Sequence, residues 1–284
     1  MGRIGFGVLM FPIHRPTHNP TLQLEGDLDL AVLCDRLGFD EFWFGEHHSG
    51  GWQIIGAPEL MIAAAAQRTS RIRLGTGVST LSYHHPLTLL DRIIQLDHLT
   101  RGRLVFGVGA GALALDATMI GHDPMQARRM MEESLEVITE LLRFDGPVTR
   151  RTDWFELRDA YLHLAPYQER LDVRVAVFRS PSGPRLAGRF GAGMLSFGAS
   201  AALGLGSKHP LTTAWQMAAA QAKAGVEHSR ERAALRIPQQ RPPAHDTAPP
   251  ERRAAPAVPV QAPPDEHAAQ PAPAGPAVAE ADPR

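Results

Sequence analysis

Glu46, His47 and His48 are the residues of this chain whose types and spacing could do chemistry. They follow an aromatic run, Phe42 to Phe44, that is typical of a strand buried on both faces. Because side chains alternate along a strand, we predict that Glu46 and His48 share one face and that His47 takes the other. One of these faces would line a pocket at the strand's end. The competing interpretation is a structural corner in which both imidazoles only satisfy their neighbours.

The histidines do not have the spacing of a metal site. Adjacent His47 and His48 point apart, and the chain contains neither His-x-His nor His-Glu-x-x-His. A metal-dependent hydrolase is therefore the weaker alternative, and we expect no metal.

Composition favours a small-molecule partner. The 284 residues are 44% hydrophobic and carry a net charge of -1, so neither a nucleic acid nor an anionic membrane is an expected partner. The single cysteine, Cys34, cannot form an internal disulfide and is expected to be a buried thiol. The first residues lack a signal-peptide pattern, and no apolar run reaches membrane-spanning length. These features predict a cytoplasmic protein.

Strand and helix patterns alternate along most of the chain, which predicts a parallel α/β sheet. The expected strands cover residues 3–10, 39–44, 71–78, 104–109, 172–178 and 193–198. The expected helices cover 21–37, 58–66, 88–99, 124–143, a segment around 186–188, and 211–224, and a small hairpin is expected within 146–166. Both an open doubly wound sheet and a (β/α)₈ barrel fit this order. The missing Gly-x-Gly-x-x-Gly after the first strand favours the barrel.

The alternating pattern stops before the chain does. Beyond Ile237 there is no Leu, Ile, Met, Phe, Tyr or Trp, and 13 of the 24 prolines lie there. Such a segment cannot bury a core, so we predict an incomplete barrel domain over residues 1–232 and a disordered tail rich in Pro, Ala and Arg over 233–284. A shifted reading frame and a genuine disordered tail both explain this composition.

Several motifs, taken in order, resemble the bacterial luciferase-like flavin-dependent monooxygenases. They are Leu37-Gly38-Phe39-Asp40-Glu41, Gly45-Glu46-His47-His48, Ile72-Arg73-Leu74-Gly75-Thr76-Gly77-Val78, Tyr83-His84-His85-Pro86, Leu96-Asp97-His98-Leu99-Thr100-Arg101-Gly102-Arg103 and Phe106-Gly107-Val108-Gly109. Gly50-Gly51-Trp52 and Ser180-Pro181-Ser182-Gly183-Pro184 look most like the limonene-monooxygenase-like branch. The resemblance covers about residues 3–232 and implies a TIM-type barrel, here truncated after about six β/α units.

This resemblance also implies a reaction. Reduced FMN, supplied by a separate flavin reductase, would react with O₂ so that a small organic substrate is oxygenated. Two alternatives stay open: hydride transfer with the deazaflavin F420, as in another branch of the superfamily, and an inactive truncated remnant. A homodimer is also consistent with the resemblance.

Site residues are implied by matching positions. His47 matches the family's active-site histidine and would act as an acid or base. The expected cofactor-binding residues are small or hydroxyl-bearing, namely Thr76, Gly77, Val78, Gly107, Gly109, Ser180, Ser182 and Gly183. Small residues let the backbone approach a flavin ring, and hydroxyls before a helix suit a phosphate. The competing interpretations are ordinary glycine spacers in strands and a Ser-Pro-Ser-Gly turn.

Overall fold

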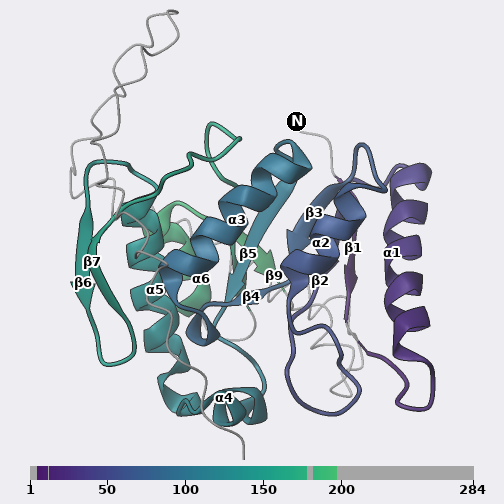
Figure 1. Cartoon of the computed structure of the whole chain (residues 1–284), viewed down its shortest axis with the longest axis horizontal. Helices are drawn as coiled ribbons and strands as arrows, with labels where there is room; N and C mark the ends of the chain where they lie inside the picture. The colour runs from purple at the N-terminus through teal and green to yellow at the C-terminus, as the bar shows by residue number, and fades with distance from the viewer. Residues whose placement is uncertain (1–4, 12, 178–181, 197–284) are drawn as a thin grey trace, which may run out of the picture. The chain divides into compact units, whose positions relative to one another are not determined.

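The computed structural model describes residues 5–11, 13–177 and 182–196 (Figure 1). Within these ranges, one sheet is parallel throughout and its main strands follow the chain order. They are β1 (Gly7–Met10), β2 (Glu41–Phe44), β3 (Arg73–Thr76), β5 (Leu104–Gly109), β8 (Val173–Val177) and β9 (Gly193–Ser196). A short strand, β4 (Ser79–Thr80), continues beyond β3 and pairs with β5. A doubly wound sheet would reverse this order, whereas a barrel adds each strand on the same side.

Helices connect these strands and pack beside one another in chain order, except the short helix over residues 114–120, which contacts two 3₁₀ turns (Figure 1). The helices are α1 (Pro20–Leu37), α2 (Pro58–Ala66), α3 (Pro86–Thr100), α4 (Ala114–Ile120), α5 (Ala127–Leu141) and α6 (Ser182–Phe190), with 3₁₀ turns η1 (Leu81–Tyr83) and η2 (Pro124–Gln126). The predicted hairpin is present as β6 (Val148–Arg151) and β7 (Glu156–Ala160). The predicted helix at 211–224 and the predicted domain boundary at 232 lie outside the described residues.

Helix α1 begins and ends at local sequence signals. The Asn19 side chain accepts hydrogen bonds from the backbone N–H groups of Thr21 and Leu22 at 2.9 and 3.3 Å. At the other end, Gly38 adopts φ 86°, a left-handed conformation that glycine takes without a steric penalty. Cys34 is buried in this helix as expected, and its burial raises the pKa of the thiol.

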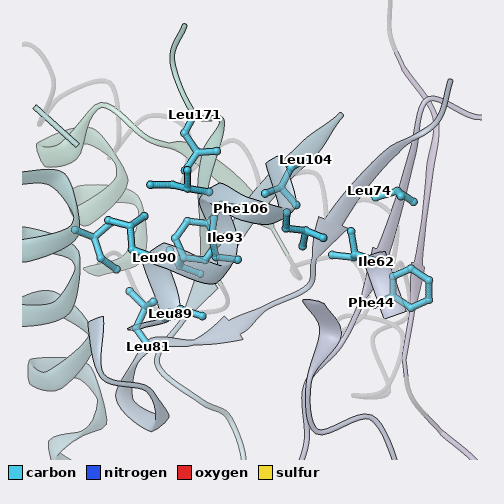
Figure 2. Packing of buried hydrophobic residues seen from close by; sticks show 14 of the residues in the cluster. Phe44, Ile62, Leu74, Leu81, Leu89, Leu90, Ile93, Leu104, Phe106 and Leu171 are labelled. Carbon is cyan, nitrogen blue, oxygen red and sulfur yellow. The ribbon is translucent and has the colours of Figure 1, made fainter. Parts of the chain in front are cut away.

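The main core lies between the sheet and its helices. Phe42 and Phe44 point from β2 into this layer, and Phe106 points into it from β5, all three with no exposed surface. Figure 2 shows Phe44 and Phe106 among apolar side chains from α2 and α3, including Ile62 and Ile93. Burying each of these large side chains stabilises the fold by about 1.5–3 kcal/mol. This core fixes the sheet that carries the ionisable residues.

Trp43 points to the opposite face of β2, into the interior of the curled sheet. A Cβ atom on Gly75 would lie 2.3 Å from the Trp43 ring, and one on Gly107 would lie 3.1 Å from it. The indole therefore occupies the room that two glycines on neighbouring strands leave. The Arg174 guanidinium lies 5.3 Å from the centre of the same ring and also pairs with Glu41. The interior of the sheet is thus filled by side chains, as in a barrel core.

No helix in the described ranges is long and apolar enough to cross a membrane.

Candidate functional site

The candidate site lies at the carboxyl-terminal edge of the parallel sheet. His47 follows β2, Gly77 follows β3, Gly109 ends β5, and Ser182 begins the helix after β8. Because all these strands run in the same direction, their carboxyl-terminal ends meet at one edge. In barrels this is the edge at which active sites form.

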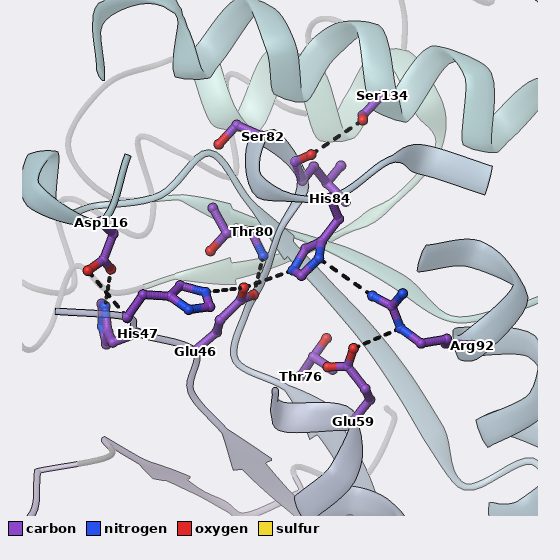
Figure 3. Close-up of polar contacts among 12 residues, drawn as sticks. Glu46, His47, Glu59, Thr76, Thr80, Ser82, His84, Arg92, Asp116 and Ser134 are labelled. Carbon is purple, nitrogen blue, oxygen red and sulfur yellow. Dashed lines mark hydrogen bonds and ion pairs between the residues drawn. The ribbon is translucent and has the colours of Figure 1, made fainter. Parts of the chain in front are cut away.

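Glu46 is a buried carboxylate that ties three segments together (Figure 3). Its Oε1 atom lies 3.0 Å from His48 Nε2 and 2.8 Å from His84 Nε2, and its Oε2 atom accepts the Thr80 N–H at 2.7 Å. Burial opposes ionisation, but the hydrogen bonds from His48, His84 and Thr80 prevail and lower the pKa of Glu46. The same contact with Glu46 raises the pKa of His48. On its far side, His84 Nδ1 lies 3.5 Å from an Arg92 guanidinium nitrogen.

His47 points away from this cluster, as strand alternation predicts. Its Nδ1 atom lies 3.0 Å from Asp116 Oδ2, which α4 supplies from the segment after β5. His48 instead contacts Glu46, so the two adjacent histidines have different carboxylate partners. The predicted separation of Glu46 and His48 from His47 is confirmed.

Thr76, Gly77 and Val78 connect β3 to the neighbouring strands. The Thr76 hydroxyl donates to the Gly107 carbonyl at 2.7 Å, and the Gly77 N–H donates to the Phe44 carbonyl at 2.6 Å. A cis peptide bond joins Gly77 and Val78. The segment is therefore at the edge where it was expected, and flavin binding by it stays a prediction.

Gly107 and Gly109 are small because other protein atoms approach them. A Cβ atom on Gly107 would lie 2.0 Å from the Thr76 carbonyl oxygen, and one on Gly109 would lie 2.6 Å from a Val78 methyl group. Neighbouring atoms therefore leave no room for a side chain at either position. These two glycines therefore have a packing role, and cofactor binding by them stays a prediction.

Ser182 and Gly183 form the first turn of α6, whereas Ser180 lies outside the described residues. An Arg128 guanidinium nitrogen lies 3.2 Å from the Ser182 hydroxyl. A hydroxyl, a guanidinium and helix N-terminal N–H groups are together a donor set that suits a phosphate dianion.

Sequence reasoning missed Asp116 and Arg128 as members of the site. Each comes from a segment distant in sequence from its partner, and neither lies in a motif that announces it. The structure also places His84 on the Glu46 carboxylate. Among the described residues, no cluster of three or more His, Cys, Asp or Glu side chains could hold a metal ion.

The sequence matches the luciferase-like monooxygenase family over residues 4–270. The chain belongs to this family. Limonene 1,2-monooxygenase of Rhodococcus erythropolis is 49% identical over 217 residues, which are 76% of this chain and 55% of that relative. 4-Hydroxyprotoasukamycin monooxygenase of Streptomyces nodosus subsp. asukaensis is 50% identical over 231 residues, which are 81% and 61% of the two chains.

A solved structure shares the fold of this luciferase-like chain. The oxygenating constituent of 3,6-diketocamphane monooxygenase from Pseudomonas putida, a type II Baeyer-Villiger monooxygenase in complex with FMN, superposes with a TM-score of 0.66 at 25% identity. The match covers 79% of this chain and 62% of that one. The predicted family and its barrel fold are confirmed, and the chain spans less than two thirds of the length of each of these three proteins.

Proposed function

We propose that this chain is the oxygenase of a flavin-dependent monooxygenase that uses reduced FMN and O₂ to oxygenate a small organic substrate. Family membership supports this function, as do the names of two relatives that are 49% and 50% identical over the aligned residues. The observation that carries the proposal is His47, whose imidazole lies at the carboxyl-terminal edge with one nitrogen held by Asp116 and the other without a hydrogen-bond partner in the described ranges.

Donors suited to the phosphate end of the cofactor are present among the described residues. Ser182, Arg128 and the start of α6 would hold the phosphate, together with the predicted Ser180 and Gly183. The ring would lie near Gly77 and Val78. When bound, reduced FMN supplies the electrons that activate O₂ for transfer of one oxygen atom to the substrate.

His47 would hold and move a proton beside the reacting oxygen. An imidazole exchanges protons near neutral pH, and its side chain is 20% exposed, so a small reactant can reach it. Asp116 anchors the ring from the opposite side.

The reduced flavin would come from a separate reductase. The related Pseudomonas protein is described as the oxygenating constituent of its monooxygenase, which supports a system of more than one component. Assembly as a homodimer and a cytoplasmic location belong to the same proposal.

The test begins with titration of the 284-residue protein with FMN and, separately, with F420, followed by fluorescence. Reduced FMN is then supplied under ¹⁸O₂ with a panel of cyclic terpenes beginning with limonene, and product is analysed for the label. We expect saturable FMN binding and labelled product. Selective binding of F420 would replace oxygenation by hydride transfer, and binding of neither cofactor would identify an inactive remnant.

A His47→Gln variant tests the assigned role. Loss of a positioned acid or base lowers turnover by about 10²–10⁴-fold, while FMN affinity and the melting temperature should stay near those of the parent. His163→Gln is the matched control, because His163 is exposed beside the β6–β7 hairpin. Equal turnover in the His47 and His163 variants would exclude the role proposed for His47.

A further inference from the structure

Asp116 is a buried carboxylate that contacts three consecutive residues of the loop after β2. Its Oδ2 atom lies 3.0 Å from His47 Nδ1, and its Oδ1 atom accepts the His48 backbone N–H at 3.3 Å. The Ser49 side chain also hydrogen-bonds to it. Only 1% of the Asp116 surface is exposed, although the flanking Leu115 and Met119 of α4 point into solvent. Helix α4 therefore turns its carboxylate inward and its two large apolar side chains, Leu115 and Met119, outward.

The charge state of Asp116 follows from its contacts. Burial opposes ionisation, but the hydrogen bonds from Ser49, His47 and the His48 amide outweigh it and lower the pKa of Asp116. An ionised carboxylate can only accept hydrogen bonds. The hydrogen between Asp116 and His47 must then reside on Nδ1, so the neutral imidazole keeps its lone pair on Nε2.

Nε2 is the atom of His47 that has no hydrogen-bond partner among the residues that the structure describes. Within the described ranges, no side chain and no backbone group hydrogen-bonds to it, while Nδ1 is occupied by Asp116. The ring is one-fifth exposed, so the free nitrogen can reach a bound reactant. His48 has the reverse arrangement, because its Nε2 atom is bound by Glu46. Two adjacent histidines are thus bound through opposite ring nitrogens by two different carboxylates.

We propose that Asp116 is a positioning residue that fixes the tautomer and the orientation of His47, so that Nε2 is the nitrogen that exchanges the proton in the reaction. This inference rests on the proposed function of His47. Asp116 touches no reactant itself; it acts through the imidazole and through the loop that carries it. A carboxylate behind a histidine plays the corresponding part in hydrolase triads, where the chemistry is different.

The decisive measurement is ¹⁵N NMR of the histidine side chains in the full-length protein, at a pH at which imidazoles are neutral. The signals are assigned by comparison with the His47→Gln variant. In the parent protein we expect His47 to carry its hydrogen on Nδ1 and His48 to carry its hydrogen on Nε2. A parent His47 with its hydrogen on Nε2 would overturn the inference without any variant being needed.

Asp116→Asn tests the positioning itself. We expect the Nδ1–H signature of His47 to be lost or averaged, while His48 keeps its own, and kcat for the oxygenation of limonene to fall by about 10²-fold with little change in KM. Ser49→Ala removes one contact of Asp116 but leaves its bond to His47, so the tautomer should persist. Asp123→Asn, which changes an exposed carboxylate of the following turn, should leave both readouts unchanged.

The outcomes separate this inference from the proposed function. An Asp116→Asn protein that keeps the parent tautomer and the parent kcat would refute the positioning role while leaving the monooxygenase assignment standing. A parent protein that shows the predicted tautomers but oxygenates nothing would refute the proposed function and leave the Asp116–His47 pair as a structural fact.

Discussion

Replacing Glu46 by Gln should be among the most damaging isosteric changes in this chain. The carboxylate accepts hydrogen bonds from His48, His84 and the Thr80 amide, at 3.0, 2.8 and 2.7 Å. A glutamine amide has the same shape but only one accepting oxygen, so its NH₂ group must face at least one of these donors. A hydrogen bond to a charged group contributes about 1.5–3 kcal/mol, and breaking a buried charge pair costs about 3–5 kcal/mol. We expect the free energy of unfolding to fall by about 3 kcal/mol.

The loss should depend on pH in a defined direction. The pKa of Glu46 is lowered from 4.5, so its contribution is present above that pH and is lost as the pH falls through its folded value. The pKa of His48 is raised from 6.5, so its contribution is present below that pH and is lost as the pH rises through its folded value. The free energy of unfolding of the parent should therefore exceed that of Glu46→Gln most between pH 4.5 and pH 6.5, and the difference should shrink on both sides.

Urea unfolding of both proteins measures this difference in the free energy of unfolding. The three pH values are 3.5, 5.5 and 8.5, of which the outer two lie about one unit or more outside the range from 4.5 to 6.5. Glu169→Gln is the control, because Glu169 is exposed, and its effect should stay within about 0.5 kcal/mol. A Glu46→Gln protein that loses less than about 1 kcal/mol at the middle pH, or a loss that does not vary with pH, would refute the account of this cluster.

Three further substitutions test the fold that carries the site. Gly107→Ala would place a Cβ atom 2.0 Å from the Thr76 carbonyl oxygen, so we expect the free energy of unfolding to drop by about 2–3 kcal/mol. Gly26 lies in open space on α1, so Gly26→Ala should raise the free energy of unfolding by about 0.5–1 kcal/mol. Urea unfolding of the pair measures both, and equal effects would contradict the packing described for β5. Asn19→Ala removes the cap of α1 and should lower the free energy of unfolding by about 1 kcal/mol in the same assay. An unchanged urea midpoint would contradict the capping role of Asn19.

Much of the fold could be predicted because its signals are local. Helix α1 is marked by a proline at its start and Gly38 at its end, and β5 is marked by an apolar run between Arg103 and the glycines. The expected strand over 71–78 is shorter in the structure, since β3 ends at Thr76 and the chain resumes its pairing with β5 only at Ser79, as β4. Apolar composition alone does not reveal such an interruption.

Helix α4 could not be predicted, and with it the partner of His47, Asp116, was missed. Its buried residues are Asp116 and Ala117, whereas Leu115 and Met119 are 55% and 62% exposed. A periodicity search looks for apolar residues on the buried face, and this helix reverses that pattern. The bond between His47 and Asp116 also joins positions 69 residues apart, which no pattern within a single sequence brings together.

The Trp43 ring, seated over Gly75 and Gly107, makes three positions on three adjacent strands depend on one another. Any side chain at either glycine would collide with the indole or with backbone, and a smaller residue at position 43 alone would leave a void. Substitutions at these positions should therefore occur together: relatives that carry a larger residue at position 75 should carry a smaller one at position 43. The layer beneath the site can change its composition over evolutionary time only in steps that keep its summed volume constant.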